Sequence, residues 1–366
     1  MKDNFFENYC NYKADSINGR YLTNESILKL NFKNIIEIGK TTNNLPVYYL
    51  KLGFGPKKIL IWSQMHGNET TSTRALLDVI SYFSNNEDLY YKNLTFHIIP
   101  ILNPDGALSY SRENYKKIDI NRDAVSLTQN ESIILRNLYE KIKPDFCFNL
   151  HDQRSIYSVS NTNKPSVLSF LSPAADDLNS ETPSRIVSMK IISSIHKNLM
   201  PILNGNISRY KDNFNVNCFG DTFQKLKTPT ILFESGHFKD DYSRENVRKY
   251  MCFALLTAIN SILYKTYKKI DYKDYYLIKE NDEYFRDILI RNIKVKKDNK
   301  SFRTDISIIF NESLDKYSKV INFIPQIFEV GKLSQLNGHS EYDLINSDKI
   351  FNLNYDNLNE LLNSIK

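Results

Sequence analysis

The chain has 366 residues, of which 41% are hydrophobic, 25% charged and 13% aromatic. At roughly 150 residues per domain, this length predicts about two domains. The apolar content is sufficient for full cores, which excludes a disordered, a collagen-like or a disulfide-scaffold protein. Lys and Arg (48) exceed Asp and Glu (42) by six charges, and such a small excess does not by itself indicate nucleic-acid binding.

The sequence contains no segment that is expected to enter a membrane. The longest apolar stretch, 251–259, is much shorter than the roughly 20 residues of a membrane span, and the first eight residues lack the apolar core of a signal peptide. We therefore expect a globular, cytoplasmic protein with neither a membrane nor a nucleic-acid partner. The four cysteines, at 10, 147, 218 and 252, are expected to be free and to act as small buried side chains.

Apolar runs alternate with helical patterns along the first 265 residues. The runs at 58–62, 94–99, 146–150 and 229–233 are continuously apolar, which is typical of strands that are buried on both faces. Apolar residues at helical spacing predict helices over 70–84, 130–142, 184–199 and about 243–264. This alternation predicts an α/β domain over residues 1–265, with a mixed, largely parallel sheet flanked by helices.

The pattern changes after about residue 265. The segment 265–273 is charged and aromatic, and we expect it to be a connector. β-like runs follow at 288–295, 302–310 and 319–330, and the polar turn 296–300 joins the first two. These features predict a small β-rich accessory domain over residues 270–366, in which no catalytic motif is visible.

Three familiar catalytic signatures are absent. The segment Gly53-Phe54-Gly55-Pro56 does not continue into G-x-G-x-x-G, because position 58 is Lys. The sequence has no Walker A motif, and Ser235 lacks the flanking glycines of a nucleophile elbow. Dinucleotide-binding, P-loop and α/β-hydrolase chemistry are therefore not predicted.

Polar residues with metal-binding and acid–base capacity instead follow the predicted strands. They are His66 and Glu69 after the first strand, Asn103-Pro104-Asp105-Gly106 and Asp119-Ile120-Asn121-Arg122 after the second, His151 after the third and Glu234 after the fourth. Sites in open α/β sheets form at the carboxyl ends of the strands, so these residues are expected to lie together. Imidazole nitrogens and carboxylate oxygens are zinc ligands, and a catalytic zinc needs three such ligands and a water.

With these motifs the sequence resembles the M14-type zinc carboxypeptidases and their relatives, the succinylglutamate desuccinylases and aspartoacylases. H-x-x-E at 66–69, N-P-D-G at 103–106, D-x-N-R at 119–122, a later His and a final Glu occur in the order of that family. The resemblance covers about residues 45–260. It implies the zinc-carboxypeptidase fold for this part of the chain and leaves the last 95 or so residues unexplained.

The resemblance implies one catalytic zinc ion per chain. Its ligands would be His66, Glu69 and His151, with a water in the fourth position. Glu234 would be the general base that takes a proton from this water and later gives it to the leaving amine. Asp119 matches the acidic residue that orients the first ligand histidine.

The resemblance also implies a set of substrate contacts. Asn121 and Arg122 match the pair that binds the carboxylate of the substrate, a task for which a planar guanidinium is suited. Arg112, the only arginine between Gly106 and Arg122, matches the arginine that polarises the scissile carbonyl. Tyr210 is the candidate for the tyrosine that carboxypeptidases place over the substrate.

Two enzyme functions remain open at this point. A carboxypeptidase acting on peptides or muropeptides is favoured by the N-P-D-G segment, and a zinc-dependent deacylase of N-acyl amino acids is favoured by the short loop between 106 and 121. The segment His151-Asp152-Gln153-Arg154 departs from the pattern of digestive carboxypeptidases and leaves the substrate open. A metal-free binding module is disfavoured, because every catalytic position is filled. His237, three residues after Glu234, is expected to have a structural or orienting role.

Overall fold

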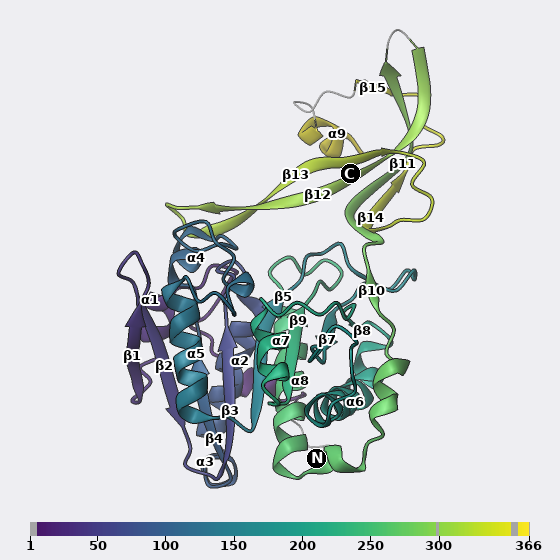
Figure 1. Cartoon of the computed structure of the whole chain (residues 1–366). Coiled ribbons are helices and arrows are strands. Elements are labelled where there is room, and N and C mark those ends of the chain that lie inside the picture. Colours follow the sequence, from purple (N-terminus) through teal and green to yellow (C-terminus); the bar gives the residue numbers. More distant parts are fainter. Residues whose placement is uncertain (1–5, 298–299, 353–357, 366) are drawn as a thin grey trace.

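The computed structural model describes residues 6–297, 300–352 and 358–365. Its first unit is built on an eight-stranded sheet in the order β1-β2-β4-β3-β5-β9-β7-β8 (Figure 1). The four central strands are β4 (Leu94–Ile99), β3 (Lys57–Ser63), β5 (Phe146–Asp152) and β9 (Thr230–Ser235). Each of them pairs in parallel with its neighbour among the four. They coincide with the four apolar runs of the sequence, so the prediction of buried parallel strands is confirmed.

The outer strands make the sheet mixed, as expected. On one side, β1 (Ile35–Lys40) and β2 (Pro46–Leu52) pair antiparallel with each other, and β2 pairs antiparallel with β4. On the other side, β7 (Leu168–Leu171) is antiparallel to β9 and parallel to β8 (Ile207–Arg209). The sequence analysis did not predict these four strands.

Helices cover both faces of the sheet, and alternate residues of each central strand pack against one layer or the other. Ile59 and Ile61 of β3 belong to a core that includes residues of α2 (Thr71–Ser84), α6 (Pro183–Leu203) and α8 (Glu245–Leu263). Leu60 and Trp62 belong to a second core, on the opposite face, with residues of α5 (Asn130–Ile142) and α7 (Phe219–Lys225). The predicted helices over 70–84, 130–142, 184–199 and 243–264 are α2, α5, α6 and α8.

Short elements complete the first unit. They are η1 (Tyr9–Asn11), α1 (Asn24–Leu28), α3 (Glu87–Tyr91), α4 (Pro104–Ser109), η2 (Ile120–Arg122), β6 (Ser158–Val159), η3 (Thr266–Lys269), η4 (Tyr272–Leu277) and β10 (Asn281–Asp282).

Within the described ranges, no helix combines the length and the apolar character that a membrane crossing requires.

A buried ion pair fixes α2 against α8. The guanidinium of Arg248 donates to the carboxylate of Asp78 through Nε at 2.7 Å and Nη2 at 2.6 Å, and both side chains are fully buried. The Tyr9 hydroxyl donates to the same carboxylate at 2.6 Å. Because a buried charge is tolerated only when it is paired and hydrogen-bonded, this contact holds the two helices and the N-terminal segment in one arrangement.

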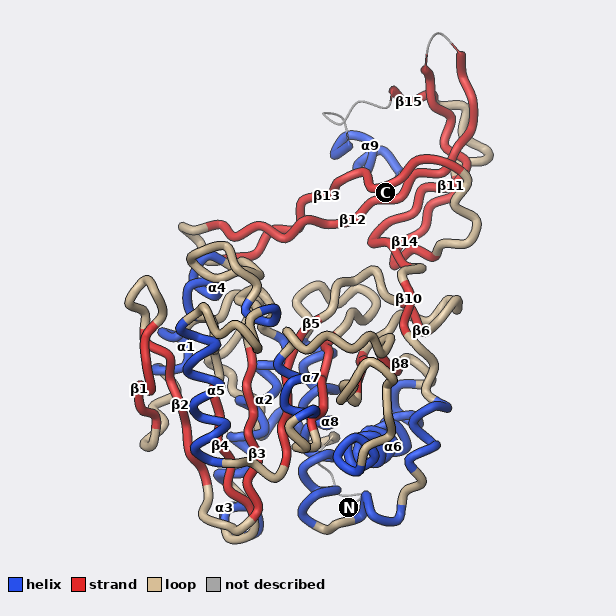
Figure 2. The backbone as a smooth tube through the Cα atoms, in the orientation of Figure 1, coloured by secondary structure: helices blue, strands red, loops and turns tan. Residues whose placement is uncertain are grey.

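The second unit is a sheet of five strands with one helix, and Figure 2 shows that strands dominate it. Its elements are β11 (Phe285–Lys297), β12 (Lys300–Asp315), β13 (Val320–Gly331), β14 (Asn337–Asp343), β15 (Ile350–Asn352) and α9 (Leu358–Ile365). The order is β13-β12-β11-β14, and β15 also pairs with β11. The predicted C-terminal β-rich region is confirmed. Positions 298–299 of the predicted turn lie outside the described residues.

The segment that was expected to be a connector packs on the first unit. Tyr267 and Tyr272 are partly buried and pack against the core that contains the residues of α6 and α8. Further along the chain, Tyr275 and Ile278 are buried in the same core, and β10 pairs with β6. The second sheet begins only at Phe285. The division into a catalytic and an accessory domain at residues 265–270 stays a prediction.

The cysteines are free, as expected. Cys147 and Cys252 are buried, which agrees with the expected role of a small apolar side chain. For the other two that expectation is wrong: Cys10 is exposed, and Cys218 is half-buried beside Arg122, whose Nη1 lies 3.2 Å from the sulfur. Cys218 and Arg122 line a cavity that is described below, which explains why Cys218 is not in the core.

Candidate metal centre and its cavity

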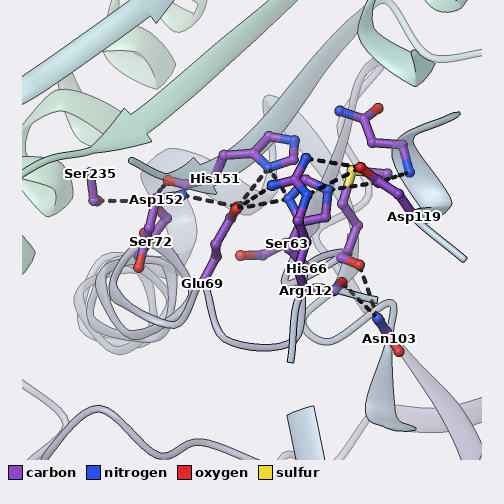
Figure 3. Close-up of polar contacts among 12 residues, drawn as sticks. Ser63, His66, Glu69, Ser72, Asn103, Arg112, Asp119, His151, Asp152 and Ser235 are labelled. Atoms are coloured by element: carbon purple, nitrogen blue, oxygen red, sulfur yellow. Dashed lines mark hydrogen bonds and ion pairs between the residues drawn. The ribbon is translucent and has the colours of Figure 1, made fainter. Parts of the chain in front are cut away.

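Three predicted ligand side chains converge at the carboxyl edge of the sheet (Figure 3). Nδ1 of His66 lies 2.8 Å from Oε1 of Glu69, and Nδ1 of His151 lies 2.7 Å from Oε2 of the same carboxylate. The two Nδ1 atoms are 3.2 Å apart. Within the described ranges, no other group of three His, Cys, Asp or Glu side chains gathers in a comparable way. The group could hold a metal ion.

The turn that carries His66 needs a glycine next to it. A Cβ atom at Gly67 would lie 1.9 Å from the carbonyl carbon of Gly106 in α4, a distance that no side chain can occupy. The loop after β3 therefore packs directly on the backbone of α4. This contact explains the glycine in His66-Gly67-Asn68-Glu69. The glycine of the N-P-D-G segment has a different reason, because a Cβ at Gly106 would lie 2.5 Å from Nδ2 of Asn103 and 2.8 Å from the carbonyl oxygen of Glu113.

Asn103 of the N-P-D-G segment links two loops of the site. Its Oδ1 accepts a hydrogen bond from the Gly106 N–H at 2.8 Å and so caps α4. Its Nδ2 donates to the carbonyl oxygens of Met65 at 3.2 Å and Arg112 at 3.4 Å. One side chain thereby positions the loop before His66 and the loop that carries Arg112.

Asp152 holds the end of β5 against the start of α2. Its carboxylate accepts hydrogen bonds from the backbone N–H groups of Thr71 at 2.7 Å and Ser72 at 3.0 Å, where the dipole of the helix favours a negative charge. Its own N–H donates to Oε2 of Glu69 at 3.2 Å. The Ser72 hydroxyl donates to the carbonyl of His151 at 2.6 Å, so two ligands on different elements share one scaffold.

Asp119 contacts the second ring nitrogen of His66, and Arg112 binds both Asp119 and Glu69. Nε2 of His66 lies 2.9 Å from Oδ1 of Asp119, which is the usual arrangement of a metal-ligating histidine whose orientation a carboxylate fixes. Arg112 donates to Oδ2 of Asp119 through Nε at 3.1 Å and Nη2 at 3.0 Å, and to Glu69 through Nη1 at 3.3 Å. Both residues therefore lie against the ligand cluster.

The electrostatics of the cluster favour a cation among the three ligands. Burial acts to raise the pKa of Glu69, but the imidazoles of His66 and His151 hold this pKa well below its usual range. Burial acts to lower the pKa of His66, but the charge of Glu69 and the bond to Asp119 raise it above its ordinary value. Burial lowers the pKa of His151. Two imidazoles and one carboxylate are a donor set of catalytic zinc sites, so the residues fit a metal ion.

Glu234 lies on β9 directly beside His151 on β5, as its register partner. Its Oε2 is buried and has no hydrogen-bond partner among the described residues. Burial, together with the charges of Glu69 and Asp152, raises the pKa of Glu234 well above its ordinary value. A buried carboxyl group with a raised pKa and an unpartnered oxygen is a candidate for a general acid–base group.

A cavity of about 400 Å³ opens beside the ligands and contains the predicted substrate-binding residues. Asn121 accepts the Phe219 N–H at 3.1 Å through Oδ1, which leaves its amide NH₂ as a donor. Arg122 is exposed and donates through Nη1 to the carbonyl of Asn121 at 2.8 Å. Tyr210 lines the same cavity, and burial and the charge of Glu234 raise the pKa of its hydroxyl, so the hydroxyl stays protonated.

All nine predicted site residues are thus found around one centre. They are His66, Glu69 and His151 in the cluster, Asp119 and Arg112 against it, and Asn121, Arg122, Tyr210 and Glu234 in the wall of the cavity. Their individual roles stay predictions.

His237 does not belong to the cluster or line the cavity. Its ring is buried and lies 4.3 Å from that of His339 on β14 and 4.6 Å from that of Tyr242. Burial lowers its pKa well below the usual range. A neutral histidine in a packed aromatic environment agrees with the expected structural role.

Sequence reasoning missed Asp221, which lines the cavity from α7. It is 7% exposed, and burial raises its pKa to about 7. Asp221 follows no predicted strand and belongs to none of the quoted motifs, so the sequence alone offered no signal for it.

Comparison with known proteins identifies relatives of this chain. Residues 26–182 match a family model described as zinc carboxypeptidase. Carboxypeptidase SOL1 of Arabidopsis thaliana is 26% identical over 124 residues, which covers 28% of this chain and 25% of that protein. Carboxypeptidase 2 of Trichophyton rubrum is 25% identical over 101 residues, with coverages of 26% and 19%. The chain therefore spans a quarter or less of the length of these curated relatives.

Solved structures share the fold at low sequence identity. A metallo-carboxypeptidase from Pseudomonas aeruginosa has a TM-score of 0.51 at 13% identity and covers 67% of this chain and 70% of its own. Bovine thrombin-activatable fibrinolysis inhibitor, solved with a tick carboxypeptidase inhibitor, has a TM-score of 0.52 at 15% identity, with coverages of 70% and 99%. These similarities concern the fold.

Substitution of Asp221 by Asn is expected to stabilise the protein above pH 7 and to have little effect near pH 4. The folded protein keeps a proton on this group up to about pH 7, whereas the ordinary pKa of the group is 3.8. Wild type therefore loses stability as the pH rises between these values, whereas the amide of the Asp221→Asn variant cannot titrate. At about 1.4 kcal/mol per pKa unit, the gain should reach a few kcal/mol. Denaturant unfolding of wild type and Asp221→Asn from pH 4 to 8 measures the gain in unfolding free energy. A gain that does not change with pH would contradict the raised pKa of Asp221.

Proposed function

We propose that this chain, which has the motifs and the fold of the M14-type zinc carboxypeptidases, is a zinc metallohydrolase that cleaves C-terminal peptide bonds. The observation that carries this proposal is one cavity that contains both halves of the chemistry. The metal cluster, Glu234 and the donors Asn121 and Arg122 all line it. A peptide whose terminal carboxylate binds to these donors places its last amide next to the cluster.

One zinc ion per chain, held by His66, Glu69 and His151, is part of the proposal. When bound, zinc lowers the pKa of a coordinated water and polarises a carbonyl. Asp119 keeps His66 in the tautomer that leaves Nδ1 free for the metal, because Nε2 carries the proton of their hydrogen bond. The Asp152 N–H and Arg112 orient the carboxylate of Glu69.

Glu234 is proposed to move the proton. Its Oε2, which has no other partner among the described residues, accepts a proton from the attacking water and returns it to the leaving amine. Arg112 donates to the oxygen of the scissile carbonyl, on which negative charge develops. The Tyr210 hydroxyl donates to the substrate from the cavity wall.

Asn121 and Arg122 are proposed to bind the terminal carboxylate of the substrate. The free amide NH₂ group of Asn121 and the Nε and Nη2 groups of Arg122 can donate two or more charge-assisted hydrogen bonds. A deacylase of N-acyl amino acids is the alternative, because its substrate also carries a carboxylate near the scissile amide. The two functions differ in the length of substrate that is cleaved.

Loss of either histidine should remove the metal. His66→Ala and His151→Ala are each expected to lose most of the bound zinc, because a catalytic site depends on three protein ligands. His196→Ala, in α6 and outside the cluster, is the matched control and should bind one equivalent. Metal analysis of the purified proteins measures the content, and full occupancy in both cluster variants would contradict the ligand assignment.

Glu234→Gln separates metal binding from chemistry. This variant should keep its zinc and lose roughly 10²–10⁴ in kcat, the usual contribution of a positioned acid–base group. Steady-state kinetics and metal analysis on the same sample measure kcat and the zinc content. Near-normal turnover would show that another group takes the proton of the water.

Arg122 provides the experiment that decides the proposed function. Arg122→Ala, or amidation of the C-terminus of a peptide, should each reduce kcat/KM by about 10- to 150-fold, which corresponds to a charge-assisted hydrogen bond of roughly 1.5–3 kcal/mol. The two losses should not add, because they remove the same contact. Arg136→Ala, whose guanidinium pairs with Glu140 on α5, should behave as wild type.

Two results would argue against the carboxypeptidase. Rapid cleavage of amidated peptides by wild type would exclude recognition of a free C-terminus. Efficient cleavage of small N-acyl amino acids together with slow cleavage of longer free peptides would favour the deacylase.

A further inference from the structure

A second cavity, of about 440 Å³, lies between the first unit and the C-terminal sheet. Its walls on the first unit include four arginines, Arg20, Arg112, Arg154 and Arg244, and its wall on the second unit is the segment 310–312 of β12. Figure 1 shows the hairpin of β12 and β13 running across the first unit, above α4. The C-terminal unit therefore contributes directly to the surroundings of the metal centre.

The two cavities meet at the metal cluster. Glu69, Arg112 and Arg154 line both of them, whereas Asn121 and Arg122 line only the first. A peptide with its terminal carboxylate in the first cavity and its last amide beside Glu69 thus continues into the second cavity. The residues on the amino side of the scissile bond then contact the wall formed by β12.

This wall is tied to the first unit by polar contacts. The Glu312 carboxylate accepts hydrogen bonds from Arg20 Nη2 at 2.9 Å and from the Tyr110 hydroxyl at 2.6 Å. The N–H of Phe310 donates to Asp287 at 2.8 Å, and the other oxygen of Asp287 accepts the Tyr242 hydroxyl, also at 2.8 Å. Since Arg20 is 6% exposed, these bonds hold β12 at a defined distance from the cluster.

The acidic groups of the second cavity already have partners. Glu312 is paired with Arg20, and Asp152 accepts the N–H groups at the start of α2. Glu69 is held by the two histidines. These three carboxylates therefore do not compete for a cation that enters the cavity.

The basic groups keep unused donors. Arg154 is exposed to the cavity and makes no hydrogen bond or ion pair with any described residue. Arg244 is 3% exposed; its Nη atoms donate to the carbonyls of Ser235 and Gln153, and its Nε is buried without a partner among the described residues. Among the charged groups of the cavity, those with unused hydrogen-bonding capacity are thus cationic.

We infer that the second cavity is a subsite for an acidic residue on the amino side of the scissile bond, and that β12 of the C-terminal unit forms part of it. Arg154 supplies the charge that selects the carboxylate, and the segment 310–312 limits the space around it. The inference rests on the proposed function, because it places a peptide across the two cavities.

Binding to a variant whose turnover is slow tests this subsite apart from catalysis. The zinc-loaded Glu234→Gln protein is titrated by calorimetry with acetyl-Ala-Ala-Glu-Phe, acetyl-Ala-Glu-Ala-Phe and their Gln counterparts. At least one Glu peptide should bind roughly 10- to 150-fold more tightly than its Gln counterpart, as expected for a charge-assisted hydrogen bond. With Arg154→Gln added, the Glu peptide and its Gln counterpart should bind equally tightly. With Arg136→Gln added, as a matched control on α5, the Glu peptide should keep its advantage.

A change on β12 tests the contribution of the C-terminal unit. Asn311→Asp adds a negative charge to the wall of the cavity, so it should weaken binding of the Glu peptide several-fold and leave the Gln peptide unchanged. If Asn311→Asp leaves the affinity for the Glu peptide relative to the Gln peptide unchanged, β12 does not form part of the subsite. Equal binding of all four peptides would overturn the subsite but not the proposed function. Failure of every peptide to bind would overturn both.

Discussion

The contact of Glu69 with two imidazoles is the interaction around which the site is organised. Three ionisable groups are buried within hydrogen-bonding distance of one another, and such a group is costly unless its charges are balanced. The surrounding structure provides that balance from several directions. Asp119 binds the far side of His66, and the Asp152 N–H binds the carboxylate. A divalent cation held by the two imidazoles and the Glu69 carboxylate would add to that balance.

The rest of the fold can be understood as the support of these contacts. Parallel β3 and β5 end at the same edge of the sheet, so one loop and one strand end deliver the two histidines to one point. Direct packing of Gly67 on Gly106 allows the loop after β3 to approach α4. Asn103 then connects this loop to Arg112. Loss of any of these links would move a ligand or its orienting group without touching the metal itself.

The sequence predicted the centre of this arrangement and missed its periphery, for physical reasons. The central strands are recognisable because both of their faces are buried, which makes them continuously apolar. β1 has no fully buried residue and β8 has only three residues, so neither has a clear pattern. Seven of the nine site residues were predictable because they belong to ordered motifs at strand ends, whereas Arg112 and Tyr210 were inferred from the family resemblance alone. Asp221 was not predictable, because it follows no predicted strand. Glu312 was not predictable either, because its contact with Arg20 joins residues 292 positions apart.

The C-terminal unit forms part of the surroundings of the metal cluster. Its sequence contains no catalytic motif, yet β12 contributes one wall of the space beside the metal cluster. On the inference drawn above, this wall selects the residue that the peptide carries on the amino side of the scissile bond.

The most direct test of the central claim is anomalous diffraction at the zinc edge from crystals of the zinc-loaded protein. The account predicts one strong peak per chain, at about 2.0–2.2 Å from Nδ1 of His66, Nδ1 of His151 and the carboxylate of Glu69, with Asp119 still bound to Nε2 of His66. A peak elsewhere, coordination through Nε2 of His66, or no peak at a saturating zinc concentration would contradict it.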